Sequence, residues 1–151
     1  MTIQVRRATA ADTPALARLR YEFRADLADA AEPETTFVAR CAPWMAERLA
    51  NGTWTAWVAD NGGEVIGTAW LHLVEKVPNP VAEPEQHGYI TNCYVQQEHR
   101  GSGSGTALLR AALAECDARG CDAVILWPTP KSRTLYQRYG FAVRDDVMER
   151  R

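Results

Sequence analysis

Glycine and serine alternate between Arg100 and Thr106, directly after a run of aromatic and β-branched residues at positions 89–95. That run is typical of a strand, and an apolar helical face follows the glycines. The face consists of Leu108, Leu109, Ala112, Leu113 and Cys116. A glycine-rich turn at the start of a helix leaves N–H groups unpaired beside the positive end of the helix dipole. The sequence therefore predicts a phosphate-binding site here.

Two common kinds of phosphate-binding loop do not fit this segment. The dinucleotide fingerprint Gly-x-Gly-x-x-Gly fails because Thr106 stands where the third glycine would follow Gly101 and Gly103. The nucleoside-triphosphate loop ends in Gly-Lys-Ser/Thr, but here Gly105 is joined directly to Thr106 without the lysine. A protein that uses this loop for ATP is therefore disfavoured.

The segment Arg100-Gly-Ser-Gly-Ser-Gly105 resembles the Arg/Gln-x-x-Gly-x-Gly/Ala signature of the GCN5-related N-acetyltransferase (GNAT) family. A second motif, Leu135-Tyr136-x-x-x-Gly140-Phe141, is similar to the family's closing Tyr-x-x-x-Gly-Phe. The resemblance covers about residues 5–147, which is most of the chain. It implies an enzyme that moves an acetyl group from acetyl-CoA directly to a primary amine of a small molecule or a protein.

The resemblance also implies which residues hold acetyl-CoA. Backbone N–H groups from Gly101 to Thr106, with Arg100 beside them, would bind the pyrophosphate, and the end of the preceding strand would lie along the pantetheine arm. Glycines suit this role because they let the backbone approach an anion closely. The implied binding residues are Cys93, Tyr94, Val95, Arg100, Gly101, Ser102, Gly103, Ser104, Gly105, Thr106, Thr129 and Ser132.

Tyr136 stands at the position where the family places its general acid, close to the thioester sulfur. When CoA leaves as a thiolate it benefits from a proton, and a phenol with an ordinary pKa of about 10 is protonated at neutral pH. The general base stays open. Some family members use a glutamate on the strand before the glycine loop, but the matching residue here is Tyr89. Other residues of suitable type are His72, His87, Glu85, Glu32 and Glu34.

Two alternatives remain beside direct acetyl transfer. A covalent route through Cys93, with His87 or His72 as its partner, lacks a third group to orient the histidine. A non-catalytic acyl-CoA-binding sensor or regulatory module would keep the cofactor site and lose turnover. For the acceptor, the acidic residues Asp26, Asp29, Glu32 and Glu34 favour a cation, and two tryptophans that could line its pocket are Trp70 and Trp127.

The composition excludes several other classes of protein. A chain of 151 residues predicts a single domain spanning 1–151, and a formal net charge of −2 without blocks of like charge disfavours nucleic-acid and membrane binding. The apolar runs are of strand length, so we expect a soluble, cytoplasmic protein. The four cysteines lack the spacing of a disulfide framework or a zinc site, and no metal site is expected. The resemblance also allows a homodimer, since family members often pair.

The apolar patterns predict the elements that must position these residues. We expect strands at 3–8, 53–59, 64–74, 89–95, 122–127 and 141–148, with 53–59 and 64–74 joined as a hairpin. We expect helices over 16–27, 37–49, 107–116 and 131–139. The order β-α-α-β-β-β-α-β-α-β is an α+β arrangement with one parallel pair, at 89–95 and 122–127. It matches the GNAT fold, a mixed central β-sheet flanked by helices.

Overall fold

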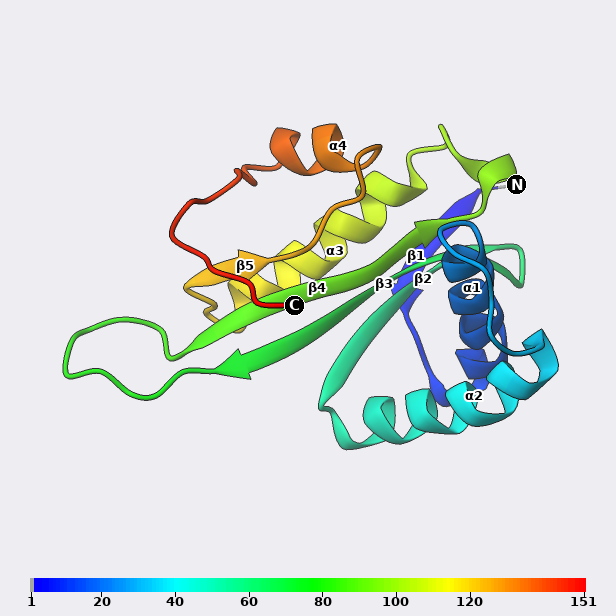
Figure 1. Cartoon of the computed structure of the whole chain (residues 1–151), viewed down its shortest axis with the longest axis horizontal. Helices are drawn as coiled ribbons and strands as arrows, with labels where there is room; N and C mark the ends of the chain where they lie inside the picture. The colour runs from blue at the N-terminus through cyan, green and yellow to red at the C-terminus, as the bar shows by residue number, and fades with distance from the viewer. Residues whose placement is uncertain (1) are drawn as a thin grey trace.

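The computed structural model describes residues 2–151 and contains one five-stranded mixed sheet in the order β1-β2-β3-β4-β5 (Figure 1). Its strands are β1 (Ile3–Arg7), β2 (Trp54–Asn61), β3 (Glu64–Glu75), β4 (Gln86–Val95) and β5 (Ala123–Ile125). The helices are α1 (Thr13–Ala25), α2 (Glu34–Asn51), α3 (Ser104–Ala118) and α4 (Arg133–Arg138), with 3-10 turns at Ala10–Asp12 and Gln97–His99. Neighbouring strands are antiparallel except β4 and β5, which are parallel.

Helices cover both faces of the sheet, with α3 on one face and α1 and α2 on the other (Figure 1). The core on the α3 face includes Ile66, Leu71, Ile90, Leu108 and Leu109. The core on the α1 and α2 face includes Leu16, Met45, Val58 and Trp70. Strand residues are buried on both faces because each face packs against helices.

Helix α3 lies close against β4 because Gly88 carries no side chain. A Cβ at Gly88 would stand 2.8 Å from the Sγ of Cys116, which is closer than real Cβ atoms approach. The apolar face that the sequence predicts for this helix is the face that packs here, since Leu108, Leu109 and Cys116 are buried. The glycine loop at the start of α3 is thereby fixed relative to the end of β4.

A network of polar contacts fixes the start of α1. Asp12 accepts two hydrogen bonds from Arg6, both 2.9 Å long, and one of 2.7 Å from the N–H of Thr9. The reciprocal contact between Thr9 and Asp12 closes the 3-10 turn Ala10–Asp12, which leads directly into α1. Because Arg6 belongs to β1, the network ties α1 to the edge of the sheet.

The predicted order of elements is confirmed from β1 to α4, including the hairpin and the single parallel pair. The final strand predicted at 141–148 is wrong, because these residues form no strand. Pro128 and Pro130 follow β5, which is only three residues long, so it offers little edge for another strand to pair with. The apolar side chains of Val143 and Met148 are 77% and 97% exposed, so no buried face holds this segment.

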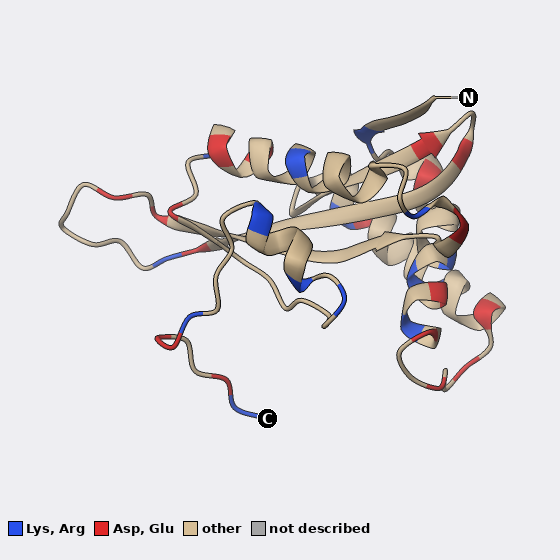
Figure 2. Ribbon diagram, turned by 90° about the horizontal axis from the view of Figure 1, so that it is seen from above, with Lys and Arg blue, Asp and Glu red and all other residues tan. Residues whose placement is uncertain are grey.

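Charges of both signs are spread over the helices and loops (Figure 2), in line with the formal net charge of −2. Among residues 2–151, every helix is too short or too polar to cross a membrane.

Candidate active site

Strands β4 and β5 pair over only three residues and then separate. The last paired residues are Tyr89 and Ile125, whereas β4 continues to Val95. Between Ile90 and Val95 the backbone groups on that edge of β4 therefore have no hydrogen-bonding partner on β5. An extended, amide-rich ligand can pair with such an edge as an added strand would.

A bulge in β4 sits at the point where the two strands separate. Asn92 and Cys93 both lie opposite Ala69 of β3, and Asn92 has a φ of 53°. The left-handed region is several times more common for Asn than for most other residues. The extra residue shifts the alternation, so that Cys93 faces the α3 layer while Tyr94 stacks on Phe23 of α1 with ring centroids 5.0 Å apart.

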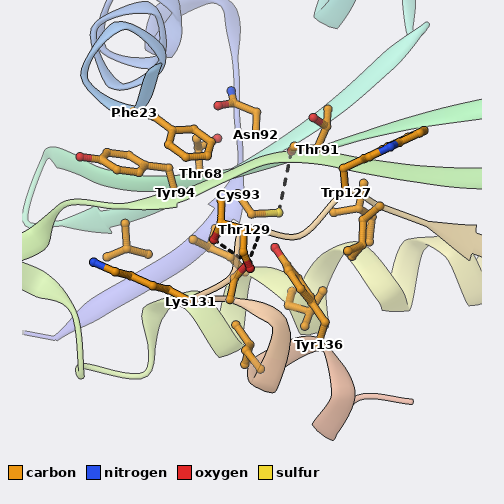
Figure 3. Close-up of a pocket in the computed structure, with 18 of the residues that line it drawn as sticks. Phe23, Thr68, Thr91, Asn92, Cys93, Tyr94, Trp127, Thr129, Lys131 and Tyr136 are labelled. Carbon is orange, nitrogen blue, oxygen red and sulfur yellow. Dashed lines mark hydrogen bonds between the residues drawn. The ribbon is translucent and has the colours of Figure 1, made fainter. Parts of the chain in front are cut away.

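A cavity of about 1000 Å³ opens around the separated strand end. Its walls come from α1, the second half of β4, the start of α3, and the chain from Leu126 to Tyr136. The cavity thus extends from the glycine loop to the α1 side of the sheet. Figure 3 shows Phe23 and Tyr94 on the α1 side of the bulge and Cys93, Thr129 and Tyr136 on the other side.

The glycine loop meets the conditions for binding an anion. Gly101 and Gly103 have φ values of 84° and 85°, a conformation that favours glycine, and both are exposed. The hydrogen bonds described for residues 2–151 leave the N–H groups of Ser104, Gly105 and Thr106 without a backbone acceptor. These unpaired N–H groups stand at the positive end of α3, which is 15 residues long.

The hydroxyls of Ser102 and Ser104 form hydrogen bonds within the glycine loop and stabilise its conformation. The Ser102 hydroxyl donates to the carbonyl of His99 at 2.6 Å and lies 2.7 Å from the Ser104 hydroxyl, and Ser104 is buried. Arg100 lines the cavity, and its Nε donates to the carbonyl of Val95 at 2.9 Å. The Arg100 guanidinium also lies over the ring of Tyr94, 5.6 Å from its centroid. These contacts link the loop to the end of β4.

Tyr136 reaches the cavity from α4, with its phenol oxygen directed toward Cys93 (Figure 3). Burial raises the pKa of the Tyr136 phenol well above its ordinary value, and the neighbouring Cys93 thiol raises it further. The phenol therefore stays protonated at neutral pH and can donate a proton. Its ring packs edge-on against Phe141 of the same motif, with centroids 5.7 Å apart.

Thr129 and Ser132 both line the cavity and pair with each other. The N–H of Thr129 donates to the Ser132 hydroxyl at 2.9 Å, and that hydroxyl lies 3.0 Å from the carbonyl of Thr129. This closed turn begins α4 and so helps to place Tyr136. Of the predicted binding residues, those that line the cavity are Cys93, Tyr94, Val95, Arg100, Gly105, Thr129 and Ser132. The other loop residues, Gly101, Ser102, Gly103, Ser104 and Thr106, do not line it. The hydroxyls of Ser102, Ser104, Thr129 and Ser132 bond to one another or to the backbone.

Cys93 is a poor nucleophile in this setting. Burial raises the pKa of its thiol to about 11, so little thiolate is present at neutral pH. Neither histidine that could activate it is nearby: His72 Nδ1 lies 2.8 Å from the carbonyl of Thr53, and His87 Nδ1 lies 2.6 Å from Asp122. The structure therefore offers no support for the covalent route.

None of the five residues proposed as a general base lines the cavity. These are His72, His87, Glu85, Glu32 and Glu34, and the carboxylate that does line it is Asp26. Of the two candidate tryptophans, Trp127 lines the cavity and Trp70 is buried in the core.

Sequence reasoning missed three cavity residues on α1, namely Arg20, Phe23 and Arg24. Phe23 looked like a member of the buried face of this helix, since it follows Leu16 and Leu19 at helical spacing. In the structure the face turns away from the core beyond Leu19, so Phe23 meets the cavity instead.

The chain is similar to known acetyltransferases over nearly its whole length. The sequence model described as "Acetyltransferase (GNAT) family" matches residues 16–141. A predicted acetyltransferase of Clostridium acetobutylicum, solved with acetyl-CoA, shares 25% identity with a TM-score of 0.82, covering 99% of this chain and 96% of that one. A GCN5-related N-acetyltransferase of Ralstonia eutropha JMP134 shares 29% identity with a TM-score of 0.77, covering 99% and 98%.

More distant structures share the fold alone. Glucosamine-6-phosphate N-acetyltransferase of Arabidopsis thaliana is 17% identical, with a TM-score of 0.72 over 100% of this chain and 99% of that one. A search of curated proteins found no match to this chain.

Proposed function

Since the chain belongs to the GNAT family of acetyltransferases, we propose that it transfers the acetyl group of acetyl-CoA directly to a primary amine of a small molecule or a protein. One observation carries the proposal: Gly105 of the glycine loop, the free edge of β4 and Tyr136 all line one cavity. An anion site, an amide-binding edge and a proton donor are what a thioester of a long phosphorylated thiol would need from a protein.

The residues present fit acetyl-CoA as the donor. The unpaired N–H groups of Ser104, Gly105 and Thr106 would bind its diphosphate, with Arg100 and Lys131 as nearby cations. The edge of β4 beyond Ile90 would pair with the amides of the pantetheine arm. This arrangement would bring the thioester toward Cys93 and Tyr136.

In the proposed reaction the neutral amine attacks the acetyl carbonyl, a C–N bond forms, and the C–S bond breaks. Tyr136 would donate its phenolic proton to the departing CoA thiolate, and solvent would restore that proton. An amine of ordinary pKa is mostly charged at neutral pH and must first lose a proton. We propose that water in the cavity takes it, since Asp26 is the lining carboxylate and it already accepts a hydrogen bond from Tyr94, at 3.4 Å.

The test is CoA release from acetyl-CoA in the presence of a panel of amines. We expect CoA release that depends on the amine, together with an N-acetylated product detected by mass spectrometry. Acetyl-CoA hydrolysis at the same rate with and without amine would contradict the proposal.

A sensor or regulatory module remains the second candidate, because neither a histidine nor a glutamate is among the cavity residues in the part of the chain described here. Thermal unfolding with CoA, acetyl-CoA and ATP separates the possibilities. A ligand at 100 times its Kd adds about 2.7 kcal/mol to the stability. Stabilisation by acetyl-CoA without turnover on any amine would favour the sensor, and stabilisation by ATP alone would contradict both.

A further inference from the structure

Arg20 lies in the wall of the cavity on the α1 side, away from the glycine loop. Its Nη1 donates to the side-chain oxygen of Asn92 at 3.3 Å, and its guanidinium lies 5.9 Å from the centroid of the Phe23 ring. The side chain is half-buried and lines the cavity. Within residues 2–151, Arg20 forms no ion pair. Most of its N–H donors are therefore free to meet a ligand.

Arg24 stands one helical turn beyond Arg20 and lines the same cavity. Like charges at this spacing destabilise a helix, and the partial burial of the unpaired Arg20 guanidinium adds a further cost. Arg24 also has no carboxylate partner among residues 2–151. Arg20 and Arg24 thus line one cavity without a carboxylate to balance their charge. An anionic ligand would supply the missing counter-ion.

The acidic residues nearby do not supply that counter-ion. Glu22 accepts hydrogen bonds from Tyr94 at 2.9 Å and from Gln96 at 3.2 Å. Glu32, which had favoured a cationic acceptor, is paired with Arg40 on the surface. The charged residues that line the cavity are Arg20, Arg24, Arg100, Lys131 and Asp26, so its lining is predominantly cationic.

We infer that the acetyl acceptor is an amine that also carries an anionic group, a carboxylate or a phosphate, and that Arg20 binds this group. The inference rests on the proposed amine acetylation and names its substrate class. Arg20 is bonded to Asn92 at the bulge, next in the chain to Cys93, which lies beside Tyr136. A short acceptor can therefore contact Arg20 while its amine meets the acetyl group.

Aromatic residues at the mouth would accommodate the apolar part of such an acceptor. Tyr89 and Trp127 both line the cavity and pack edge-on, with ring centroids 5.5 Å apart. Trp127 is 60% exposed, so its ring is available to a ligand. Aromatic faces bind apolar and aromatic groups without fixing a single orientation.

The experiment compares matched acceptors on the wild type and on two variants. The pairs are phenylalanine with phenethylamine, and aminoethyl phosphate with ethylamine, so that the first pair tests a carboxylate and the second a phosphate. Arg20→Gln removes the charge, and Arg18→Gln is the control because Arg18 is an exposed residue of α1 that does not line the cavity. Initial rates of CoA release give KM for each acceptor and for acetyl-CoA.

We expect the wild type to favour the anionic member of at least one pair. Arg20→Gln should raise KM for that acceptor by about 10- to 100-fold, the usual effect of hydrogen bonds to a charged group. KM for acetyl-CoA and for the neutral amines should stay within about twofold, and Arg18→Gln should change nothing. Arg20→Lys, which keeps the charge, should fall between the wild type and Arg20→Gln if the latter folds poorly.

Three results would overturn the inference. The first is a wild type that acetylates the neutral member of both pairs at least as well. The second is an Arg20→Gln variant that loses acetyl-CoA and all acceptors equally, because Arg20 would then only hold the bulge or bind the donor. The third is a calorimetric result that needs no turnover. It is a Kd for N-acetylphenylalanine and for N-acetylated aminoethyl phosphate on the wild type that is no lower than the Kd of their neutral analogues. Absence of turnover alone would count against the proposed function, not against this inference.

Discussion

On the α3 and α4 side of β4 the cavity combines main-chain groups with side chains such as Arg100 and Tyr136, whereas on the α1 side it presents side chains alone. The α3 and α4 side, which we propose binds the donor and call the donor side, offers the N–H groups at the start of α3 and the unpaired edge of β4. The α1 side, which we propose binds the acceptor and call the acceptor side, offers Arg20, Phe23 and Arg24. Main-chain groups are the same in every sequence that adopts the fold, but side chains change with each substitution. The donor side is therefore suited to one ligand, and the acceptor side can be altered without disturbing it.

Tyr136 is one of the side chains on the proposed donor side, and its proposed role depends on its phenol. Tyr136→Phe should lower kcat by about 10²–10⁴-fold, the usual contribution of a general acid, and leave KM for acetyl-CoA unchanged. Because the pKa of this phenol is raised above its ordinary value, the wild type should lose no rate through Tyr136 up to about pH 10. Steady-state kinetics against pH measures both effects.

The control for this change is Tyr139→Phe, because Tyr139 lies at the end of α4 and does not line the cavity. Its kcat should stay within about twofold of the wild type. Equal losses in the two variants would mean that Tyr136 supports α4 and donates no proton.

Gly105 allows a direct test of main-chain binding. Gly105→Asp should raise the Kd for CoA by about 100- to 1,000-fold, because a carboxylate would repel the diphosphate. Gly105→Ala is the matched control: a Cβ here would meet only Val95, at 3.9 Å, and the φ of Gly105 is not positive. It should bind CoA within a few-fold and be more stable by about 0.5–1 kcal/mol. Calorimetry would refute the assignment if both variants bound CoA equally well.

Substitution of Cys93 tests whether acetyl transfer needs a side chain other than Tyr136. Cys93→Ala should keep kcat within about fivefold, since a thiol with a pKa of about 11 supplies little thiolate. Mass spectrometry of the wild type mixed with acetyl-CoA alone should show no acetylated protein. An acetyl adduct on Cys93, with activity abolished in the variant, would restore the covalent route.

Asp12 does not line the cavity, so its substitution should affect stability and leave substrate binding unchanged. Asp12→Asn should lower the free energy of unfolding by about 1 kcal/mol, because it weakens the contacts with Arg6 and Thr9. KM for both substrates should not change. The Arg6 guanidinium lowers the pKa of Asp12, so its stabilising effect is present above the unfolded pKa of about 4.

That stabilising effect should be lost as the pH falls through the lower pKa of the folded state. Denaturant unfolding at several pH values checks this, with wild type and Asp12→Asn converging in acid. A stability difference that persisted at the lowest pH would show that the carboxylate charge is not responsible.

Sequence reasoning predicted the elements of the fold and the backbone conformation of the glycine loop. Gly101 and Gly103 have positive φ values, a conformation that favours glycine. The presence of glycine at these positions was therefore enough to predict the loop. The strands and helices were also recognisable, because burial on one or both faces leaves a periodic pattern. Gly140, which belongs to the same motif as Tyr136, has a φ of 88° just after α4. The role of Tyr136 as general acid stays a prediction.

The acceptor side could not be read in the same way. Arg20 looks like any polar residue of an amphipathic helix until the bulge in β4 brings Asn92 beside it. Asn92 was the available signal, since Asn in mid-strand tolerates a positive φ. The strand wrongly predicted at 141–148 failed for a related reason: alternation in a sequence does not show whether a sheet edge lies within reach.

The extra residue of β4 has a consequence for chain length. Asn92 is the extra residue of the bulge. The residues after it therefore point to the same faces of the sheet as they would in a regular strand that lacked Asn92. Loss of Asn92 would leave Cys93 toward α3 and Tyr94 toward α1, with both sequence motifs intact, and would remove the amide that accepts from Arg20. A one-residue deletion, which usually ruins a strand, would here separate acceptor choice from donor binding.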